Sequence, residues 1–363
     1  MATESPAGWS RRDCMLLAAG ALLQGLPRAG AAAGPTRFAA AWNDAAAGAR
    51  IGVLLREGGS LRPHRVVDVP TRAHGLLPQP GGAVLAVSRR PGDWLLRWHP
   101  DTADAQWAWA EPGRSFNGHA LESADQRLLF TTETDQFTGQ GLLGVRDAAT
   151  LEKVDEWPTH GADPHELVRG PGGAVWVANG GILTLAETGR TKHALHRMDS
   201  SLVQLDAGDG RLRGQWRLPD ARLGLRHLAW GRTAGGDSML GIALQAEHDD
   251  PVAKAAAPVL AVFDGSALRS RAPAAPLSGY GGGVAFAAGS FVVSCPRSNG
   301  LARFDAHGRQ TGWTRLATAC AVDARASELW AAGQSQAQLL SRSPQAFDVD
   351  AALQLDNHWR VLG

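Results

Sequence analysis

Five of the 12 histidines in this chain occupy equivalent positions in a repeated motif. Each begins a short apolar run, and two further runs of this kind begin with glycine or cysteine. In chain order the motifs are Ala73-His74-Gly75-Leu76, Gly118-His119-Ala120-Leu121, Pro164-His165-Glu166-Leu167, Arg226-His227-Leu228-Ala229, Gly281-Gly282-Gly283-Val284, Ala319-Cys320-Ala321-Val322 and Asn357-His358-Trp359-Arg360. Imidazole nitrogen is a ligand of zinc, copper, iron and nickel, and a thiolate favours the softer of these metals. The repeat predicts a transition-metal site whose ligands are His74, His119, His165, His227, His358 and Cys320.

Charged residues lie in the segments that we expect beside these histidines. Acidic side chains could orient the imidazoles by accepting hydrogen bonds, as most metal-bound histidines require; the candidates are Glu133, Glu166 and Glu247. Arginine could bind a carboxylate or another anion, with solvated side chains as the alternative; the candidates are Arg89, Arg90, Arg114, Arg226 and Arg297. Asn179, in the unusual loop Ala178-Asn179-Gly180-Gly181, completes the candidate cofactor-binding residues.

The histidine motifs belong to a larger unit that recurs roughly every 40 to 60 residues. A turn precedes an apolar run in each unit, as in Pro171-Gly172-Gly173-Ala174-Val175, and a later run ends on an acidic residue, as in Val203-Gln204-Leu205-Asp206. Such turns are typical of β-hairpins. Repeats of this kind indicate a β-propeller, and we place six blades at residues 74–116, 117–163, 164–225, 226–280, 281–318 and 319–355.

The seventh blade is split between the two ends of the chain. Residues 38–42, 51–56 and 65–69 resemble three strands without an inner strand, and residues 358–362 resemble a spare strand. Their pairing would remove open sheet edges, which favour aggregation. The predicted fold is all-β: a seven-bladed β-propeller over residues 34–363, closed by the C-terminal strand joining the N-terminal blade.

The position of each histidine in its blade predicts where the site lies. Each begins an innermost strand, so we expect the five side chains at one mouth of the central channel, where the decorated loops also converge. A structural role is the alternative, because a Gly-His pair can tie a blade together by hydrogen bonds, as in WD-type propellers. Cys295 and Cys320 add a further alternative, since two cysteines in an oxidising compartment tend to form a disulfide.

The N-terminal segment has the features of an export signal. Arg11 and Arg12 directly precede an apolar run from Met15 to Leu26, which is too short to span a bilayer. Small residues follow, and cleavage after Ala33 would leave a mature chain starting at Gly34. We therefore expect a twin-arginine signal peptide over residues 1–33 and a periplasmic protein without a membrane anchor.

Composition excludes several classes of function. The formal net charge is +1 over 363 residues, so no electrostatic bias toward nucleic acid exists. The 44 glycines and 20 prolines fit a fold of short strands and tight turns. The sequence contains no nucleophile elbow, phosphate-binding loop, zinc-protease motif or haem-attachment motif. These absences weaken a hydrolase hypothesis but leave a metal-centred one open.

Several motifs together resemble those of an uncharacterised family of bacterial proteins. They include Gly113-Arg114-Ser115-Phe116-Asn117-Gly118-His119, Thr131-Thr132-Glu133-Thr134-Asp135, His160-Gly161-Ala162-Asp163-Pro164-His165-Glu166-Leu167 and Asp356-Asn357-His358. That family comprises proteins exported by the twin-arginine route, predicted to be seven-bladed β-propellers and often encoded beside imelysin-type iron-regulated proteins. The resemblance implies an accessory role in periplasmic iron handling, with imelysin-type or other iron-handling proteins as partners.

These observations lead to one main functional hypothesis and two alternatives. The main hypothesis is a monomeric, non-catalytic periplasmic protein that holds a transition metal, iron or copper, or an iron-bearing ligand at the histidine-rich mouth. One alternative is a metal-dependent enzyme on the same scaffold, either a lactonase-like hydrolase or a redox protein. The other is a propeller with a purely structural or protein-binding role.

Overall fold

The computed structural model describes residues 35–44, 47–184, 188, 191–340, 344–350 and 352–362. The predicted signal peptide, residues 1–33, lies outside these ranges. Nearly all regular structure in them is β-strand. Within these ranges, no helix is long and apolar enough to cross a membrane.

Five four-stranded antiparallel sheets follow one another along the chain in the described part. Their order follows the predicted repeat, but β4, β8 and β18 begin at Ala73, Arg114 and Leu223, before the predicted blade starts at 74, 117 and 226. Their strands are β4 (Ala73–Pro78), β5 (Val84–Ser88), β6 (Trp94–Trp98) and β7 (Ala105–Trp109); β8 (Arg114–Glu122), β9 (Leu128–Asp135), β10 (Gly141–Asp147) and β11 (Lys153–Pro158); β12 (Pro164–Arg169), β13 (Val175–Asn179), β16 (Ser201–Leu205) and β17 (Leu212–Trp216); β18 (Leu223–Arg232), β19 (Ser238–Ala246), β20 (Leu260–Phe263) and β21 (Leu268–Ser270); β22 (Gly283–Ala287), β23 (Ser290–Cys295), β24 (Gly300–Asp305) and β25 (Gln310–Arg315).

The two ends of the described chain share one larger sheet. Its order is β26-β27-β28-β29-β3-β2-β1-β30, and the C-terminal strand β30 pairs antiparallel with the N-terminal strand β1. Between the two halves, β29 and β3 pair in parallel only at Asp348 with Ser60 and Val349 with Leu61. The strands are β26 (Ala321–Arg325), β27 (Glu328–Ala332), β28 (Gln336–Leu340), β29 (Gln345–Val349), β30 (Leu353–Leu362), β1 (Arg37–Asp44), β2 (Gly48–Glu57) and β3 (Ser60–Asp68).

Tight turns between the first and second strands need glycine. In the turn Pro80–Gly82, which forms the short 3-10 helix η1, Gly81 and Gly82 have φ values of 83° and 95°. Residues with a Cβ atom rarely adopt this conformation. Proline at the first position of the turn fixes its own φ and donates no hydrogen bond. The same Pro-Gly-Gly sequence forms η2 (Pro171–Gly173) before β13, so sequence-equivalent turns have equivalent structures.

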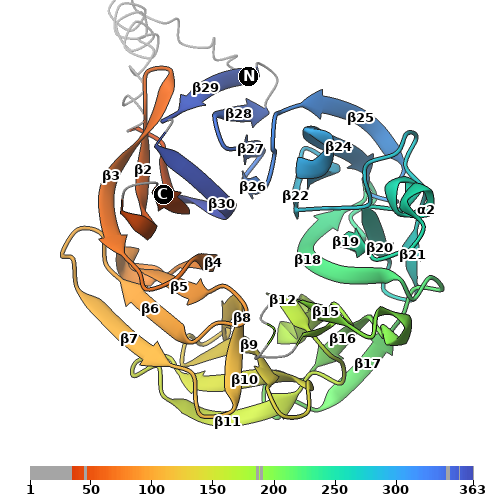
Figure 1. Cartoon of the computed structure of the whole chain (residues 1–363), viewed down its shortest axis with the longest axis horizontal. Helices are drawn as coiled ribbons and strands as arrows, with labels where there is room; N and C mark the ends of the chain where they lie inside the picture. The colour runs from red at the N-terminus through yellow and green to blue at the C-terminus, as the bar shows by residue number, and fades with distance from the viewer. Residues whose placement is uncertain are drawn as a thin grey trace, which may run out of the picture. The chain divides into compact units, whose positions relative to one another are not determined.

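The innermost strand of each sheet contacts those of its neighbours. Figure 1 shows these inner strands, and the contacts run from β4 to β8, β8 to β12, β12 to β18, β18 to β22, β22 to β26, β26 to β30 and β30 to β4. Apolar side chains fill the space between adjacent sheets in separate clusters. The inner strands therefore place their first residues at one common end.

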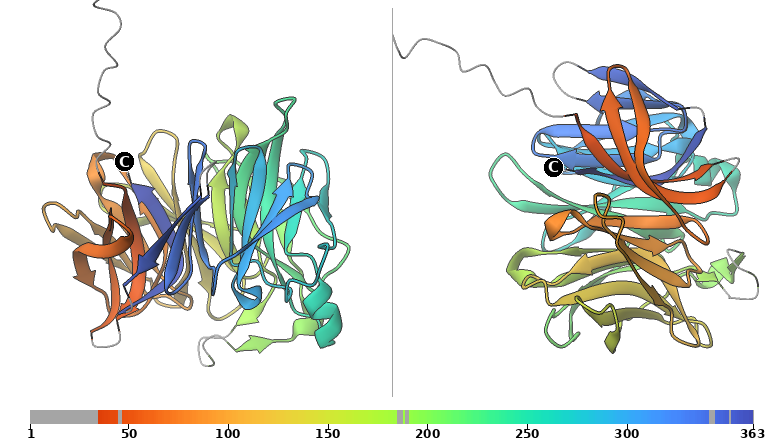
Figure 2. Two further views of the ribbon diagram at one scale, coloured as in Figure 1. Left: turned by 90° about the horizontal axis from the view of Figure 1, so that it is seen from above. Right: turned by 90° about the vertical axis from the view of Figure 1, so that its left-hand side faces the viewer.

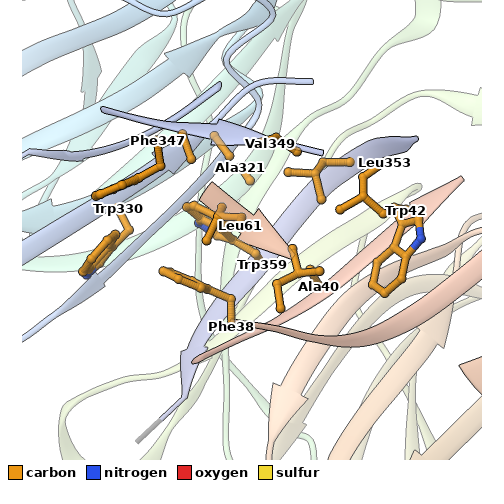
Figure 3. Packing of buried hydrophobic residues seen from close by; sticks show 14 of the residues in the cluster. Phe38, Ala40, Trp42, Leu61, Ala321, Trp330, Phe347, Val349, Leu353 and Trp359 are labelled. Carbon is orange, nitrogen blue, oxygen red and sulfur yellow. The ribbon is translucent and has the colours of Figure 1, made fainter. Parts of the chain in front are cut away.

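A hydrophobic cluster joins the first and last strands (Figure 3). The rings of Phe38 on β1 and Trp359 on β30 are stacked with centroids 4.5 Å apart, and Phe38 contacts Trp330 edge to face at 5.2 Å. Trp359 is almost fully buried, at 1 % exposure. Stacked aromatic pairs add roughly 0.5–1.5 kcal/mol to the effect of burial. This packing fixes the position of β30 against β1.

Additional short elements decorate one end of the sheets. The hairpin of β14 (Leu183–Thr184) and β15 (Lys192–His193), the 3-10 helix η4 (Leu195–Arg197) and helix α2 (Pro251–Ala256) lie in loops that follow second strands. Figure 2 shows α2 and the hairpin on the same side of the sheets. Since Ala246, the last residue of β19, pairs with Leu223, the first residue of β18, these loops emerge where the inner strands begin.

We predict that Trp359→Ala lowers the free energy of unfolding by about 3–5 kcal/mol, because it leaves a cavity beside Phe38. Chemical denaturation followed by intrinsic fluorescence and circular dichroism measures this loss. The control is Trp109→Ala, since Trp109 is 56 % exposed and its loss should cost less than about 1 kcal/mol. Equal losses in the two variants would contradict the role of β30 in joining the ends.

Candidate metal centre

The five predicted histidines form one buried cluster. His74, His119, His165, His227 and His358 come from five different inner strands, and their exposed fractions are only 1–8 %. Their ring centroids are 4.6–6.1 Å apart in the pairs in contact. The structure thus brings together side chains that span most of the sequence.

The spacing of ring nitrogens matches that of metal ligands. His165 Nε2 lies 3.4 Å from His74 Nε2 and 3.3 Å from His227 Nε2. A metal that holds nitrogens at about 2.0–2.1 Å in tetrahedral geometry places them about 3.3–3.4 Å apart. A second triad, His74, His119 and His358, also brings its ligand atoms within 4.8 Å of one another. Both triads contain His74, so one ring joins the two halves of the cluster.

Every one of these histidines lies in an irregularity of its strand. The ladder between first and second strands shifts register at Ala73/Leu76, Phe116/Ala120, Pro164/Leu167 and Leu225/Leu228, and β30 shifts against β1 between Trp359 and Leu355. The two inner strands without histidine, β22 and β26, pair without a shift. Among the seven inner strands described, the bulges therefore occur in the five that carry a histidine. Bulges re-aim side chains and are frequent beside functional sites.

Two glycines permit the close approach of neighbouring rings. A Cβ atom on Gly118 would lie 2.6 Å from Cδ2 of His74, and the φ of Gly118 is +103°, which disfavours other residues. A Cβ atom on Gly75 would collide with the backbone carbonyl of Gly118. The bulges of β4 and β8 therefore fit against each other only because both residues lack a side chain.

The cluster contains buried nitrogens without hydrogen-bond partners. They are His74 Nδ1, His119 Nε2, His165 Nδ1, His227 Nδ1 and His358 Nε2. A buried polar atom without a partner costs about 1–3 kcal/mol. A structural Gly-His role would instead pair these nitrogens with backbone groups. In His74, His165 and His227 the unpartnered atom is Nδ1, whereas Nε2 of His165 lies 3.3–3.4 Å from Nε2 of the other two rings. The Nε2 atoms of these three rings are the ones that converge as metal ligands would.

Glu166 is the carboxylate nearest to the cluster. Its Oε2 lies 3.4 Å from His227 Nδ1 and accepts a 2.8 Å hydrogen bond from the backbone N–H of Leu228, while Oε1 lies 3.9 Å from His119 Nδ1. Arg360 Nη2 lies 3.4 Å from the same Oε1. At this position the Glu166 carboxylate suits an acceptor for the Nδ1–H groups of His119 and His227. Nε2 of each ring would then be the atom that binds a metal ion.

Burial keeps the five imidazoles neutral. It is the largest cause that holds the pKa of each ring well below its ordinary value of 6.5, and mutual repulsion among the histidines adds to this in four of the five. Arg226 further lowers the pKa of His165, His227 and His358. Only Glu166 acts in the opposite direction, raising the pKa of His119. Neutral imidazole is the form that binds metal.

The cysteines lie apart from this donor set. Among the described residues, the groups with converging ligand atoms contain only histidine. Cys320 is buried, and its thiol donates to the Asp356 carbonyl at 3.7 Å. Burial raises the pKa of Cys320 and of Cys295 to about 12, and both are free thiols rather than a disulfide. The thiolate, which is the ligand form, is therefore disfavoured at Cys320.

Two of the predicted acidic residues bind basic side chains elsewhere. Glu133 accepts hydrogen bonds from Thr131 at 2.6 Å, Arg146 at 2.9 Å and Lys153 at 2.6 Å. Glu247 pairs with Lys192 of the β14–β15 hairpin, and with Lys254 of α2 at 3.3 Å. Glu133 therefore ties β9 to the outer strands β10 and β11. Glu247 ties together the two insertions at the histidine end.

The remaining predicted residues also have protein partners. Arg114 forms a bidentate ion pair with Glu156 at 2.7 and 2.9 Å, and the Arg297 guanidinium lies 4.5 Å from the ring centroid of Tyr280. The Asn179 side chain donates to the Thr159 carbonyl and to Ser201. The side chains of these three residues therefore interact within the protein. Arg89 also has interactions within the protein.

A buried ion cluster beside the histidines involves two further predicted arginines. Arg90 forms an ion pair with Asp163, and Arg226 Nη1 lies 3.8 Å from the other oxygen of that carboxylate. Sequence reasoning assigned Asp163 and Arg360 no role. Arg360 pairs with Asp323 and Glu166. Each lies two residues from a predicted ligand, in the motifs Asp163-Pro164-His165 and His358-Trp359-Arg360. This spacing is the sequence signal that could have identified them.

Taken together, the sheets and the cluster define an all-β protein with a histidine centre built by its inner strands. The chain belongs to the family described as "Protein of unknown function (DUF1513)", whose model matches residues 67–362. No curated protein matches this chain.

Solved structures with a similar fold have little sequence identity to this chain. Apo AztD from Citrobacter koseri is 11 % identical, with a TM-score of 0.51 over 91 % of this chain and 98 % of that one. The β-propeller domain of Myceliophteria thermophila Cps50 (Swd1) is 13 % identical, with a TM-score of 0.46 over 74 % and 76 % of the two chains. The PQQ-bound aldose sugar dehydrogenase from Streptomyces coelicolor is 15 % identical, with a TM-score of 0.44 over 81 % and 97 %. The first likeness concerns the fold alone, and a β-propeller fold agrees with the sheet arrangement.

We predict that the metal-free protein loses stability as the pH falls below about 6.5. Imidazoles of the unfolded chain take up protons near that pH, whereas the depressed pKa values keep the buried rings neutral, so acid favours the unfolded state. Each ring contributes up to about 1.4 kcal/mol per pH unit until its own pKa is reached. Denaturant unfolding between pH 7.5 and 5 measures the slope. His358→Asn should reduce it, and an unchanged slope in this variant would be the contrary result.

Proposed function

We propose that this protein binds a transition-metal ion, iron or copper, or an iron-bearing ligand through its five buried histidines. The carrying observation is that imidazoles from five strands meet at β-bulges, where two triads bring their ligand nitrogens within 4.8 Å of one another. Rings confined to a bulge are ordered before a guest arrives, which lowers the entropic cost of binding. The donor nitrogens converge on one another, and this arrangement supports a role in binding.

We propose further that the scaffold is a seven-bladed propeller closed by its C-terminal strand. The pairing of β30 with β1 and the contact of β30 with β4 support this architecture. The short parallel pairing of β29 with β3 is then a contact between two blades. In such a ring the histidine cluster lies in the central channel, at the end where the decorated loops emerge.

The proposed cellular role is an accessory one in iron handling in the periplasm. The paired Arg11 and Arg12 before a short apolar run support export of the folded protein. The motif resemblance supports imelysin-type or other iron-handling proteins as partners. A binding protein for metal ions fits such a role because it can hold and pass on cargo without chemical conversion.

A double variant tests the metal site directly. His119→Ala together with His165→Ala removes one ligand from each triad, so we expect metal loading to fall by at least 100-fold while far-UV circular dichroism is unchanged. Elemental analysis of protein purified from the periplasm, followed by titration of the metal-free form, measures loading. The control replaces His64 and His307, which are exposed, and removes the same number of imidazoles. Normal loading of the cluster variant would rule out the proposed site.

A second experiment tests the route of export. Replacing Arg11 and Arg12 by lysine should leave unprocessed precursor in the cytoplasm, because lysine does not replace the arginine pair that defines the signal. Cell fractionation and immunoblotting of precursor and mature chains provide the measurement. A variant with the arginine pair intact and Arg28→Lys controls for an arginine-to-lysine replacement elsewhere in the segment. Wild-type export of the Arg11/Arg12 variant would contradict the twin-arginine assignment.

A further inference from the structure

The Arg360 side chain on β30 connects three other inner strands around the histidine cluster. Its Nη1 donates to Asp323 Oδ1 on β26 at 3.1 Å, and its Nε donates to the Leu76 carbonyl on β4 at 3.3 Å. Its Nη2 donates to Glu166 Oε1 on β12 at 3.4 Å. The second oxygen of Asp323 accepts a 2.8 Å hydrogen bond from the Val361 N–H. The guanidinium is therefore anchored from several sides.

The Glu166 carboxylate is held at both of its oxygens. Oε1 accepts from Arg360, and Oε2 accepts the 2.8 Å hydrogen bond from the backbone N–H of Leu228. Only 10 % of the Glu166 side chain and 14 % of the Asp323 side chain are exposed, against 34 % for Arg360. Attraction between charges is stronger where water is largely excluded, as it is at both carboxylates. Since the planar guanidinium bonds both carboxylates at once, the position of Glu166 depends on Arg360.

The same carboxylate faces one ligand of each histidine triad. Its Oε2 lies 3.4 Å from Nδ1 of His227, a member of the triad with His74 and His165. Its Oε1 lies 3.9 Å from Nδ1 of His119, a member of the second triad. In the described part of the chain, no other carboxylate oxygen lies within 4 Å of a ring nitrogen of the five histidines. Glu166 is thus the acidic group through which a side chain outside the cluster can orient ligands of both triads.

A carboxylate beside a neutral imidazole influences which ring nitrogen carries the proton. The negative oxygen attracts an N–H group and repels a lone pair, so Nδ1–H is favoured in both His119 and His227. Both distances exceed the range of about 2.7–3.2 Å for a formed N–H···O hydrogen bond, so this preference comes from charge. The lone pair then resides on Nε2, which is the atom that would bind a metal ion.

We propose that Arg360 is a positioning residue of the metal site, and that it acts through Glu166 on one ring of each triad. This inference rests on the proposed metal-binding function. Asp323 anchors the guanidinium, and the guanidinium holds the Glu166 carboxylate. That carboxylate fixes the Nδ1–H tautomers of His119 and His227, so both rings present Nε2 to the ion. The strand β30 therefore supplies one ligand and also the side chain that orients two others.

The tautomers of the two rings test the inference in metal-free mature protein labelled with ¹⁵N-histidine. Long-range ¹H–¹⁵N spectra distinguish Nδ1–H from Nε2–H, and the variants His119→Asn and His227→Asn assign the signals. We expect mainly Nδ1–H on both rings in the wild type. The Nδ1–H fraction should fall at both rings in Arg360→Gln, because Glu166 is then released. Nε2–H as the main form of either wild-type ring, or unchanged tautomers in Arg360→Gln, would overturn the inference.

Titration with Co(II), whose visible absorption reports ligand geometry, measures the consequence for a bound metal. Arg360→Gln should bind Co(II) roughly 10–100-fold more weakly and with a changed spectrum, as is usual when a group that orients a metal ligand is lost. The control is Arg325→Gln, which removes an arginine of β26 that donates to the Leu362 carbonyl of β30 and should keep wild-type affinity and spectrum. Equal binding by Arg360→Gln and the wild type, or an equal loss in the control, would overturn the inference alone. Failure of the wild type to bind Co(II), iron or copper would overturn the proposed function and the inference with it.

A second variant decides the matter if Arg360→Gln does not fold. Asp323→Asn keeps the size of the side chain and removes the charge that anchors the guanidinium. We expect the same shift of tautomers, smaller in size, and weaker Co(II) binding. Far-UV circular dichroism and the unfolding midpoint show whether this variant is folded. Wild-type tautomers and Co(II) affinity in folded Asp323→Asn would then refute the positioning role.

Discussion

The burial of five neutral imidazoles against one another is the constraint on which this structure depends. Each ring is removed from water, and each would repel the others and the neighbouring arginines if it took up a proton. β-Sheets supply few free partners for such groups, because their backbone amides and carbonyls are used in the ladders. The packing of the sheets must therefore compensate for nitrogens that remain without hydrogen bonds. A cation bound by Nε2 of His119 or His358 would satisfy some of these nitrogens.

The histidines of the cluster are held by strands of different sheets and not by loops. Each of five inner strands contributes one ring, so the position of every ligand is fixed by a separate hydrophobic core between neighbouring sheets. Glycine at 75 and 118 removes the side chains that would keep β4 and β8 apart. Rigid sheets hold side chains more accurately than mobile loops. The positions of the imidazoles are therefore well defined, because a ring cannot shift without distorting the sheet that carries it.

The sequence predicted this cluster because a repeat places equivalent residues at equivalent positions of the inner strands. The expectation that each histidine begins its strand was wrong for His119, His227 and His358, which lie inside β8, β18 and β30. Aligning the motifs was enough to find all five histidines, and Glu166 followed from its place beside His165. Glu133 and Glu247 come from comparable loop ends but turn toward Lys153 and Lys192, since the direction of a side chain depends on register and on partners distant in sequence. The pairs Arg90–Asp163 and Arg360–Glu166 have no local sequence pattern.

The pairing of β30 with β1 gives the last strand a particular significance. His358 and Trp359 are consecutive in β30, so one residue completes the histidine cluster while the next packs against Phe38 of β1. The five-histidine cluster is incomplete until β30 has paired with β1. Formation of the cluster is thereby coupled to the pairing of strands that lie far apart in the sequence. A bound ion would stabilise the pairing of β1 with β30, so separation of these strands would favour release of the ion.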